Sequence, residues 1–423
     1  MSPTRSPRSS TPSLLRPLSN RVYRHLFAAQ VVALTGTGLS TVALTLLAYD
    51  LSGGNAGEVL GIALALKMVA YVFVSPLVAS VAHRFPRRRL LISLDVSRAA
   101  AVALMPFVTE VWEVYWLIFF VSGCSAGFTP TFQATIPDIL PAEAEYTRAL
   151  SLSRLAYDLE ELLSPALAAL ALAFVGYQAL FASNAVAFLC SALLVFSVTI
   201  PRAGAAKRTG NTWAKITYGT RRYLATARLR GLLALNLAAA AASAVVIVNT
   251  VIYVRERFGL DDSAVALALG ASGAGSMLTA LALPRILERR ADRPLMLAGG
   301  ALLTAGLAAT VFVPGYPALL VTWFVLGVGL SLVQTPAGRL LQRSAAPADR
   351  PAIYAAQFSL SHACWLLTYP TAGLLAAAIG LDTAAAILTV VAGVAAIAAG
   401  LLWKTKRASG ETEPDGLPSA TQS

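Results

Sequence analysis

Long apolar blocks dominate the pattern of hydrophobic and polar positions along the chain, and only short polar stretches separate them. A block of roughly 20 residues is long enough to cross about 30 Å of hydrocarbon as a helix. Twelve such blocks occur, six on each side of a longer polar interruption. Because an open sheet edge leaves backbone groups unsatisfied in lipid, all twelve are predicted to be helices.

The predicted helices form two sets of six, so the fold class is an all-α membrane protein with two six-helix bundles. The first set covers residues 26–51, 56–82, 90–109, 113–136, 147–175 and 177–200. The second covers residues 229–254, 262–287, 294–313, 317–341, 351–377 and 382–403. The expected domains are a disordered cytoplasmic N-terminus at 1–25, bundles at 26–200 and 229–403, a cytoplasmic linker at 201–228 and a disordered cytoplasmic tail at 404–423.

Composition and charge agree with this picture. Hydrophobic residues make up 57% of the chain and charged residues only 13%, which is unlike a soluble domain. Of the 33 lysine and arginine residues, 28 lie before the first span, in alternate loops or within one helical turn of them, or in the tail, and only Arg255 and Arg257 lie in loops on the opposite side. The positive-inside rule therefore places both termini in the cytoplasm, with the basic loops against anionic lipids of the inner leaflet. Such alternation is not expected of a nucleic-acid-binding protein. Abundant alanine and a high ratio of arginine to lysine favour a bacterial inner membrane.

The two sets of helices are internal repeats. A shift of about 206 positions brings "HRFPRRRLL" at 83 onto "RRADRPLML" at 289, and "TP" at 129 onto "TP" at 335. At nearly the same shift, "SLSR" at 151 falls on "SLSH" at 359. Agreement at nearly one offset indicates duplication of a six-helix unit.

Parallel six-helix repeats joined by a basic loop resemble the major facilitator superfamily, and specifically its drug:proton antiporter branch. The segment "ASVAHRFPRRRLLISLDVSR" is similar to the signature between spans two and three of that family. Its matching residues are Arg84, Arg87, Arg88, Arg89, Asp95 and Arg98. His83 stands where the family has an aspartate that helps to lock the cytoplasmic face, so the lock is expected to be absent here or titratable. The resemblance implies a monomer whose two bundles rock around a central site.

The fifth span also resembles the antiporter motif of the family, a proline preceded by glycines at helical spacing. Pro165 matches, whereas Ser164, Ala168 and Glu160 replace glycines. The motif is degenerate, so the antiporter prediction depends more on topology.

Four ionisable side chains interrupt the fifth span in "RLAYDLEELLSP". A charge at the bilayer centre costs roughly 3 kcal/mol, so these groups should face protein or a watery cavity. Helical geometry puts Arg154, Asp158 and Glu161 on one stripe and Glu160 almost opposite. An ion pair of Arg154 with Asp158 would leave Glu161 or Asp158 to carry a proton, while Glu160 would meet the other bundle or Arg98. The alternative is an ion-pair cluster that merely holds helices together.

Other candidates lie in neighbouring spans. Lys67 and His362 are expected at similar depth on adjacent helices, where His362 could carry a proton or pack as an interface histidine. Uncharged polar stripes on spans one, four, seven and ten either line the substrate cavity or join helices. Their members include Gln30, Thr37, Thr41, Gln133, Asn236, Asn249 and Gln334. Trp365, Tyr369 and Tyr157 could stack on an organic substrate or pack in the core.

No GxxxxGK[ST] loop occurs, and "GASGAG" at 270 is typical of close helix packing. The protein is thus expected to be no enzyme, to need no cofactor and to draw its energy from an ion gradient. The leading hypothesis is a proton-driven exporter of a small molecule.

Two alternatives remain open. The segment "SHACWLLTYPTAG" resembles nickel-resistance exporters of the superfamily, with His362 and Cys364 as ligands for nickel or cobalt. A different class would be a sensor or lipid-moving protein that couples to no ion.

Overall fold

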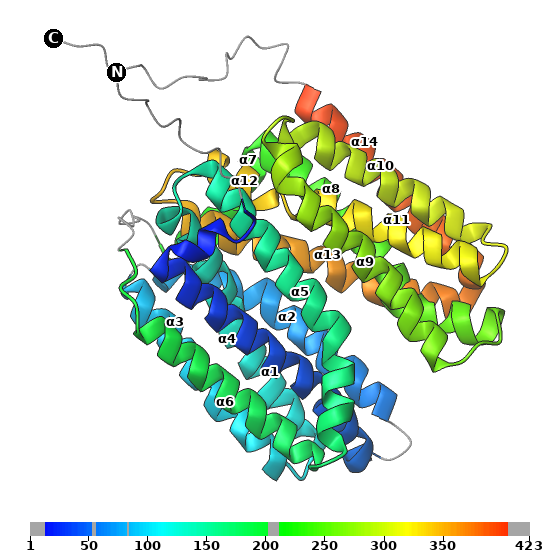
Figure 1. Cartoon of the computed structure of the whole chain (residues 1–423), viewed down its shortest axis with the longest axis horizontal. Coiled ribbons are helices and arrows are strands. Elements are labelled where there is room, and N and C mark those ends of the chain that lie inside the picture. The colour runs from blue at the N-terminus through cyan, green and yellow to red at the C-terminus, as the bar shows by residue number, and fades with distance from the viewer. Residues whose placement is uncertain (1–12, 53–55, 83, 202–210, 405–423) are drawn as a thin grey trace, which may run out of the picture.

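The computed structural model describes residues 13–52, 56–82, 84–201 and 211–404. These residues are almost entirely helical and contain no strand, which confirms the predicted fold class. Figure 1 shows two bundles of long helices joined by a shorter helix. The bundles meet at the end where the first helix begins and the last one ends, and they diverge toward the opposite end. We refer to these as the terminal end and the open end.

Six helices form the first bundle: α1 (Arg21–Ser52), α2 (Ala56–Ala82), α3 (Arg87–Leu104), α4 (Val111–Ile139), α5 (Glu143–Leu172) and α6 (Tyr177–Phe196). The second bundle contains α8 (Ala227–Ala244), α9 (Asp262–Leu287), α10 (Asp292–Val311), α11 (Tyr316–Gln334), α12 (Ala337–Ser344), α13 (Arg350–Ile379) and α14 (Leu381–Lys404). Two π-helical segments, Val245–Asn249 and Ile252–Arg257, continue α8. Helix α7 (Thr212–Ala225) links the bundles.

Eleven helical stretches of the described chain are long and apolar enough to cross a membrane, and α11 with α12 counts as one of them. Helix α5 is equally long, with 30 residues, but its charged side chains interrupt the apolar pattern. It packs between α1 and α9, inside the assembly, so its polar positions have protein neighbours. The twelve predicted spans therefore correspond to these eleven stretches and α5.

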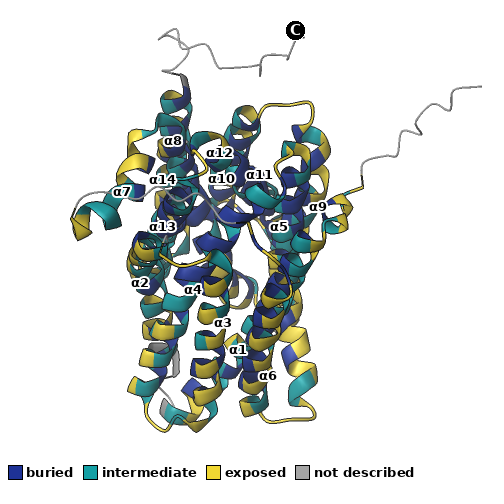
Figure 2. Cartoon of the chain, turned by 90° about the vertical axis from the view of Figure 1, so that its left-hand side faces the viewer, coloured by how far each residue is buried: buried dark blue, intermediate teal, exposed yellow. Residues whose placement is uncertain are grey.

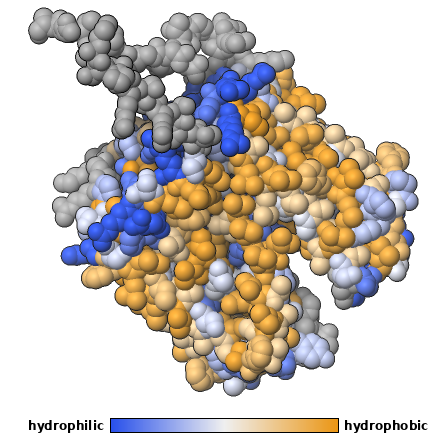
Figure 3. Space-filling model, viewed as in Figure 1, coloured by the Kyte–Doolittle hydropathy of each residue, from blue (hydrophilic) through white to orange (hydrophobic). Residues whose placement is uncertain are grey.

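The outer surface suits a bilayer. Large apolar side chains such as Phe73, Trp116 and Leu193 are exposed on it. Figure 2 shows exposed residues along the outer faces of the helices and buried residues toward the centre. In Figure 3 apolar residues cover most of the visible face, and the surface is hollowed between the two bundles at the open end. We call this hollow the cleft.

Close helix packing explains the last glycine of "GASGAG". A Cβ on Gly275 of α9 would run into the backbone carbonyl of Phe324 on α11. A Cβ on Gly327 of α11 would likewise run into the carbonyl of Ser272 on α9. Small residues at a crossing let two backbones approach closely in a membrane. The packing role predicted for this segment is confirmed at Gly275.

The segments outside the spans differ from expectation. Residues 16–19 form a 3₁₀ helix and α1 begins at Arg21, so the described part of the predicted disordered N-terminus is helical. Residues 1–12 and 405–423 lie outside the described residues. The predicted linker contains α7, whose Tyr218 hydroxyl donates to Asp349 of α13 at 2.9 Å. The other domain limits remain predictions.

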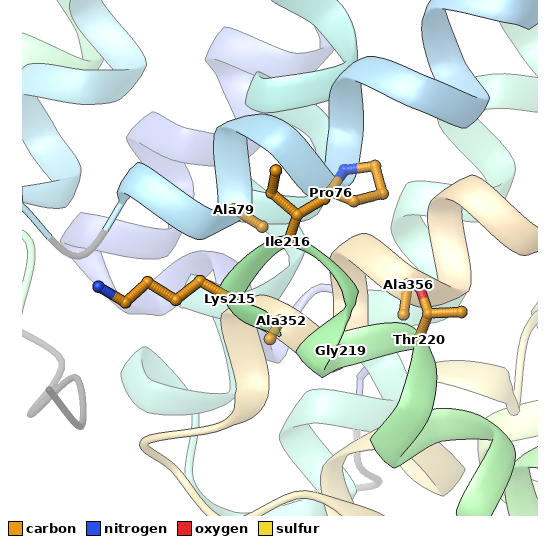
Figure 4. A pocket seen from close by; sticks show the side chains of 8 residues that line it. All are labelled: Pro76, Ala79, Lys215, Ile216, Gly219, Thr220, Ala352 and Ala356. Atoms are coloured by element: carbon orange, nitrogen blue, oxygen red, sulfur yellow. The ribbon is translucent and has the colours of Figure 1, made fainter. Parts of the chain in front are cut away.

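Helix α7 covers the line along which the bundles meet. A Cβ on Gly219 would strike the carbonyl of Ala352 on α13, so only glycine permits this approach. A small pocket lies beside this contact and is lined by residues of α7, α2 and α13. Figure 4 shows the Lys215 side chain extending away from the other residues that line it. Small and apolar side chains predominate there, and the pocket is distinct from the cleft.

Helix α9 begins next to the open end with a side-chain cap. The carboxylate of Asp261 accepts a hydrogen bond from the Ser263 hydroxyl at 2.7 Å and another from the Ala264 amide at 3.1 Å. These hydrogen bonds lower the pKa of Asp261. A negative charge at this position also suits the positive end of the helix dipole.

Candidate functional site

Ion pairs join the bundles at the terminal end. In the first ion-pair cluster, Asp138 at the end of α4 pairs with Arg350, the first residue of α13. Arg87, the first residue of α3, approaches the same carboxylate at 2.6 Å. One aspartate of the first bundle thus holds an arginine from each bundle.

The second ion-pair cluster has the opposite arrangement of charge. Arg343 of α12 pairs with Asp292 of α10 at 2.7 Å and with Glu143, the first residue of α5. Arg339 pairs with both carboxylates as well. A further pair, Arg148 with Glu288 at 2.7 Å, crosses between α5 and the residue after α9.

The internal repeat relates the two clusters. Arg87 is equivalent to Asp292, Asp138 to Arg343, and Glu143 to Arg350, at shifts of 205 to 207 positions. Each equivalent pair carries opposite charges, so the repeat has conserved the arrangement and inverted its sign. Tyr146 and Tyr354 are also equivalent, and their hydroxyl oxygens lie 2.8 Å apart across the bundle interface. These contacts close the terminal end while the cleft is open at the other.

The predicted gate motif is only partly within this closure. His83 lies outside the described residues, and Arg84 and Arg89 are exposed. Arg88 donates to the carbonyl of Phe196 and covers the Phe196 ring. Sequence reasoning missed Asp138, the carboxylate that Arg87 does contact. Its equivalence to Arg343 in the repeat was the available signal.

Asp95 and Arg98 form a buried pair inside the first bundle. Ser191 donates a hydrogen bond to Asp95 at 2.8 Å. The Arg98 guanidinium lies between the rings of Phe128 and Phe188, at 4.2 and 4.3 Å from their centroids. The expected contact of Glu160 with Arg98 is wrong, because Arg98 is bound to Asp95 instead.

Deeper along α5, Arg154 joins the two bundles. Its guanidinium lies 2.8 Å from Asp158, so the expected pair within the helix is present. The same group donates to Ser276 of α9 at 2.9 Å and to Gln334 of α11 at 2.5 Å. Asp158 is buried, and one of its oxygens has no hydrogen-bond partner among the described residues. Arg154 therefore attaches the pair to α9 and α11 of the second bundle.

Glu161 lies one turn nearer the open end and is exposed. Within the described part of the chain, its carboxylate forms no hydrogen bond or ion pair. It lies close enough to Arg154, Asp158 and Tyr369 for their charges to interact. A carboxylate that is near a buried ion pair and open to solvent can exchange protons with the cleft.

Glu160 points elsewhere, as the helical geometry predicted. It is half-buried, contacts the hydroxyl of Ser164, and has Lys67 of α2 as its nearest opposite charge. The structure also brings Lys67 and His362 to one place, the interface of α2 with α13. The Lys67 ammonium lies 5.8 Å from the centroid of the Tyr71 ring, and that ring lies 4.7 Å from the His362 ring.

Several polar residues of spans one, four, seven and ten bond within the protein and are not free to contact a substrate. Gln30 accepts a hydrogen bond from Ser153 of α5, and Gln334 holds Arg154. The hydroxyls of Thr37 and Thr41 donate to carbonyls of their own helix. Gln133 is half-buried on α4, and the buried amides of Asn236 and Asn249 have atoms without partners among the described residues.

The described residues around His362 and Cys364 do not supply enough further ligands for a metal site. Cys364 is buried, and its thiol donates to the carbonyl of Leu360. No group of three or more His, Cys, Asp or Glu side chains that could hold a metal ion occurs in the described residues.

Comparison with known proteins identifies the family. The model of the Major Facilitator Superfamily matches residues 26–248 and 231–421, which together span nearly the whole chain. The chain belongs to the major facilitator superfamily. It is a multi-span membrane protein of a transporter family, as the sequence predicted.

Similar proteins include bacterial transporters. The uncharacterized MFS-type transporter YfiS of Bacillus subtilis (strain 168) is 25% identical over 339 residues, which cover 77% of this chain and 79% of that protein. Macrolide efflux protein A of Streptococcus pyogenes is 26% identical over 184 residues, which cover 42% of this chain and 45% of that protein.

Solved structures share the fold at low identity. The human organic anion transporter MFSD10 (TETRAN) has a TM-score of 0.78 at 12% identity, with 92% of this chain and all of that chain covered. A bacterial homologue of the iron transporter ferroportin, in its outward-facing state, has a TM-score of 0.77 at 14% identity, with 90% and 99% covered.

Proposed function

We propose that this superfamily member is a proton-coupled exporter that works by alternating access. One observation carries the proposal: the exposed carboxylate of Glu161 lies beside the buried Arg154–Asp158 pair, and Arg154 also binds the second bundle. A site that exchanges protons is thereby adjacent to a contact that must change when the bundles move. Both carboxylates lie on α5, the helix whose sequence resembles the drug:proton antiporter motif.

The transport cycle follows from this arrangement. The described conformation is the outward-facing state, with its terminal end toward the cytoplasm of a bacterium and its cleft toward the outside. A proton from outside neutralises Glu161, which removes a negative charge that competes with Asp158 for Arg154. Asp158 then holds the guanidinium more tightly, and the hydrogen bonds of Arg154 to Ser276 and Gln334 can break. The terminal end then opens, and cargo entering from the cytoplasm displaces the proton.

The cargo is an organic amphiphile. The name of Macrolide efflux protein A supports this class, as do the aromatic side chains of Tyr157 and Tyr369 near the carboxylates. The exposed Arg84 and Arg89 face anionic lipid headgroups of the inner leaflet. The protein acts as a monomer with cargo and protons as its partners.

Reconstituted vesicles with an acidic interior test the proposal. The purified full-length protein should accumulate a radiolabelled macrolide or a cationic dye through molecules whose terminal end faces outward. Glu161→Gln should abolish the gradient-driven component, because a glutamine cannot carry the proton. Glu256→Gln, at an exposed glutamate of the π-helical segment Ile252–Arg257, is the matched control and should leave transport intact.

Two outcomes of the vesicle experiment would contradict the proposal. If no macrolide, dye or Ni²⁺ is taken up under the gradient, or if uptake survives in Glu161→Gln, the protein is not a proton-coupled exporter through this site. Uptake of Ni²⁺ alone would instead favour a metal exporter.

A further inference from the structure

Helix α13 presents one face of aromatic and imidazole side chains. Phe358, His362, Trp365 and Tyr369 follow one another at spacings of four, three and four residues. Residues at these spacings share one side of an α-helix. The rings of Phe358 and Trp365 lie 4.1 and 5.1 Å from the His362 ring, so the row is continuous at this end.

The end of this row at His362 can donate hydrogen bonds. His362 Nδ1 lies 2.7 Å from the carbonyl of Phe358, which can only accept, so Nδ1 carries the hydrogen. Lys67 supplies an ammonium group beside it, across the Tyr71 ring. The buried indole nitrogen of Trp365 is a donor with no acceptor among the described residues. The Lys67 ammonium and the Trp365 indole are thus two donors near the His362 ring, to which a bound acceptor could attach.

The end at Tyr369 is acidic. Glu161 lies near the Tyr369 hydroxyl, which also approaches the Ser243 hydroxyl of α8 at 3.5 Å. Tyr157, one turn before Glu161 on α5, is 36% exposed. An exposed carboxylate flanked by aromatic rings suits an organic ammonium group, which gains both ion pairing and cation–π attraction.

The two ends are separated by a fixed length. His362 and Tyr369 are seven residues apart, which is about 10 Å along a helix. Both bundles contribute to each end: Lys67 and Glu161 belong to the first bundle, and the row on α13 belongs to the second. A molecule bound along the row therefore contacts surfaces that separate when the bundles rock.

Other charges face these groups and limit what can bind. Glu160 lies near Lys67, and the Arg154–Asp158 pair lies near Glu161. Neither forms an ion pair of 4.0 Å or less with the group it faces, within the described residues. Each end therefore retains its own charge for a ligand, with a counter-charge nearby when the site is empty.

We propose that this face of α13, with Lys67 and Glu161 opposite it, is a two-ended cargo site. It takes an elongated, partly aromatic amphiphile that carries an amine at one end and a carboxylate or other hydrogen-bond acceptor about 10 Å away. The inference rests on the proposed export function for its cargo, but not on proton coupling. It also moves the site from the expected spans one, four, seven and ten to α2, α5 and α13.

Rigid probes test the two ends separately. The probes are biphenyls substituted at opposite ends with an aminomethyl group, a carboxylate, both or neither, and their binding to the purified full-length protein is measured by titration calorimetry at one pH. The probe with both groups should bind at least about tenfold more tightly than either singly charged probe, since each end adds a charge-assisted hydrogen bond.

Variants assign each end to its residue. Lys67→Met should weaken the doubly substituted probe about tenfold and leave the amine probe unchanged. Glu161→Gln should weaken the doubly substituted probe by a similar factor and leave the carboxylate probe unchanged. Trp365→Phe keeps the ring, removes the indole donor and should weaken only the probes with a carboxylate. Lys215→Met on α7 is the matched control and should change nothing.

Two results would overturn the proposal. One is a doubly substituted probe that binds no better than the amine probe. The other is an equal loss for all probes in Lys67→Met and Glu161→Gln, or no loss in either. If Lys67→Met unfolds the protein, Trp365→Phe gives the same decision for that end. No gradient is applied, so a failure of proton coupling leaves these outcomes unaffected.

Discussion

The two carboxylates Asp158 and Glu161 of α5 lie in different environments at the bundle interface. Asp158 is buried and paired, whereas Glu161 is exposed and unpaired within the described chain. Removing one partner of a buried pair leaves an uncompensated charge, which costs far more than changing an exposed group. The two carboxylates of α5 should therefore respond differently to the loss of their charge.

Asp158→Asn should destabilise the protein by about 3 kcal/mol, because the Arg154 guanidinium loses its counter-charge. Glu161→Gln should change stability by less than about 1 kcal/mol. Thermal unfolding of both variants in the same detergent measures the difference. Equal shifts of the unfolding midpoint would show that Glu161 is part of the pair.

The tyrosine pair gives a second prediction from hydrogen-bond direction. The Tyr354 hydroxyl donates to the carbonyl of Gly338 at 3.2 Å, so its oxygen accepts from Tyr146. Tyr354→Phe leaves two buried groups without partners and should cost about 2 kcal/mol, whereas Tyr146→Phe should cost about 1 kcal/mol. The reverse order in chemical or thermal unfolding would contradict this assignment.

The sequence predicted contacts within helices better than contacts between them. The Arg154–Asp158 pair follows from a four-residue spacing, which a helix fixes locally. Asp138 and Glu143 pair with Arg350 and Arg343, which lie about 200 positions away in the sequence. The spacing of residues along one helix cannot predict such partners. The meeting of Lys67 with His362 was expected, but from the helix neighbours that the family resemblance implied and not from spacing along one helix.

Most helices were predicted from the length of their apolar stretches, and α5 and α7 depart from this pattern for physical reasons. Helix α5 fails the apolar criterion because ionisable side chains interrupt it, and these are tolerated where α5 packs between α1 and α9. Helix α7 escaped prediction because it is short and only half apolar. The polar stripes did not reveal which helices line the cleft, because Thr37 and Thr41 satisfy their hydroxyls within their own helix.

The crossing of α9 and α11 yields a prediction about helix packing. Gly327→Val should cost about 3 kcal/mol, because the new side chain meets the carbonyl of Ser272 and must force the helices apart. Gly273→Val on α9, where a Cβ meets no atom within 4 Å, is the control. Comparable losses of thermal stability in the two variants would rule out the close approach.

At the scale of the whole molecule, the two ion-pair clusters decide how firmly the terminal end is closed. Arg350 and Asp138 are mostly buried, with 14% and 17% of their side chains exposed, whereas Arg343 and Glu143 are 43% and 41% exposed. Exposed pairs contribute little because water screens them. Arg339 also duplicates the contacts of Arg343.

Arg350→Gln should therefore open the terminal end more than Arg343→Gln does. Spin labels on the first turns of α5 and α13 would report the change as a longer distance in Arg350→Gln. A larger opening in Arg343→Gln would mean that the second cluster, not the first, holds the bundles together.

The central claim is that cargo and a proton exchange at Glu161, and proton release on cargo binding tests it most directly. The purified protein is mixed with a macrolide in weakly buffered detergent solution containing a pH indicator. We expect the wild-type protein to release protons on binding and Glu161→Gln to bind the macrolide without release. Equal proton release from both proteins, or none from the wild type despite binding, would contradict the account.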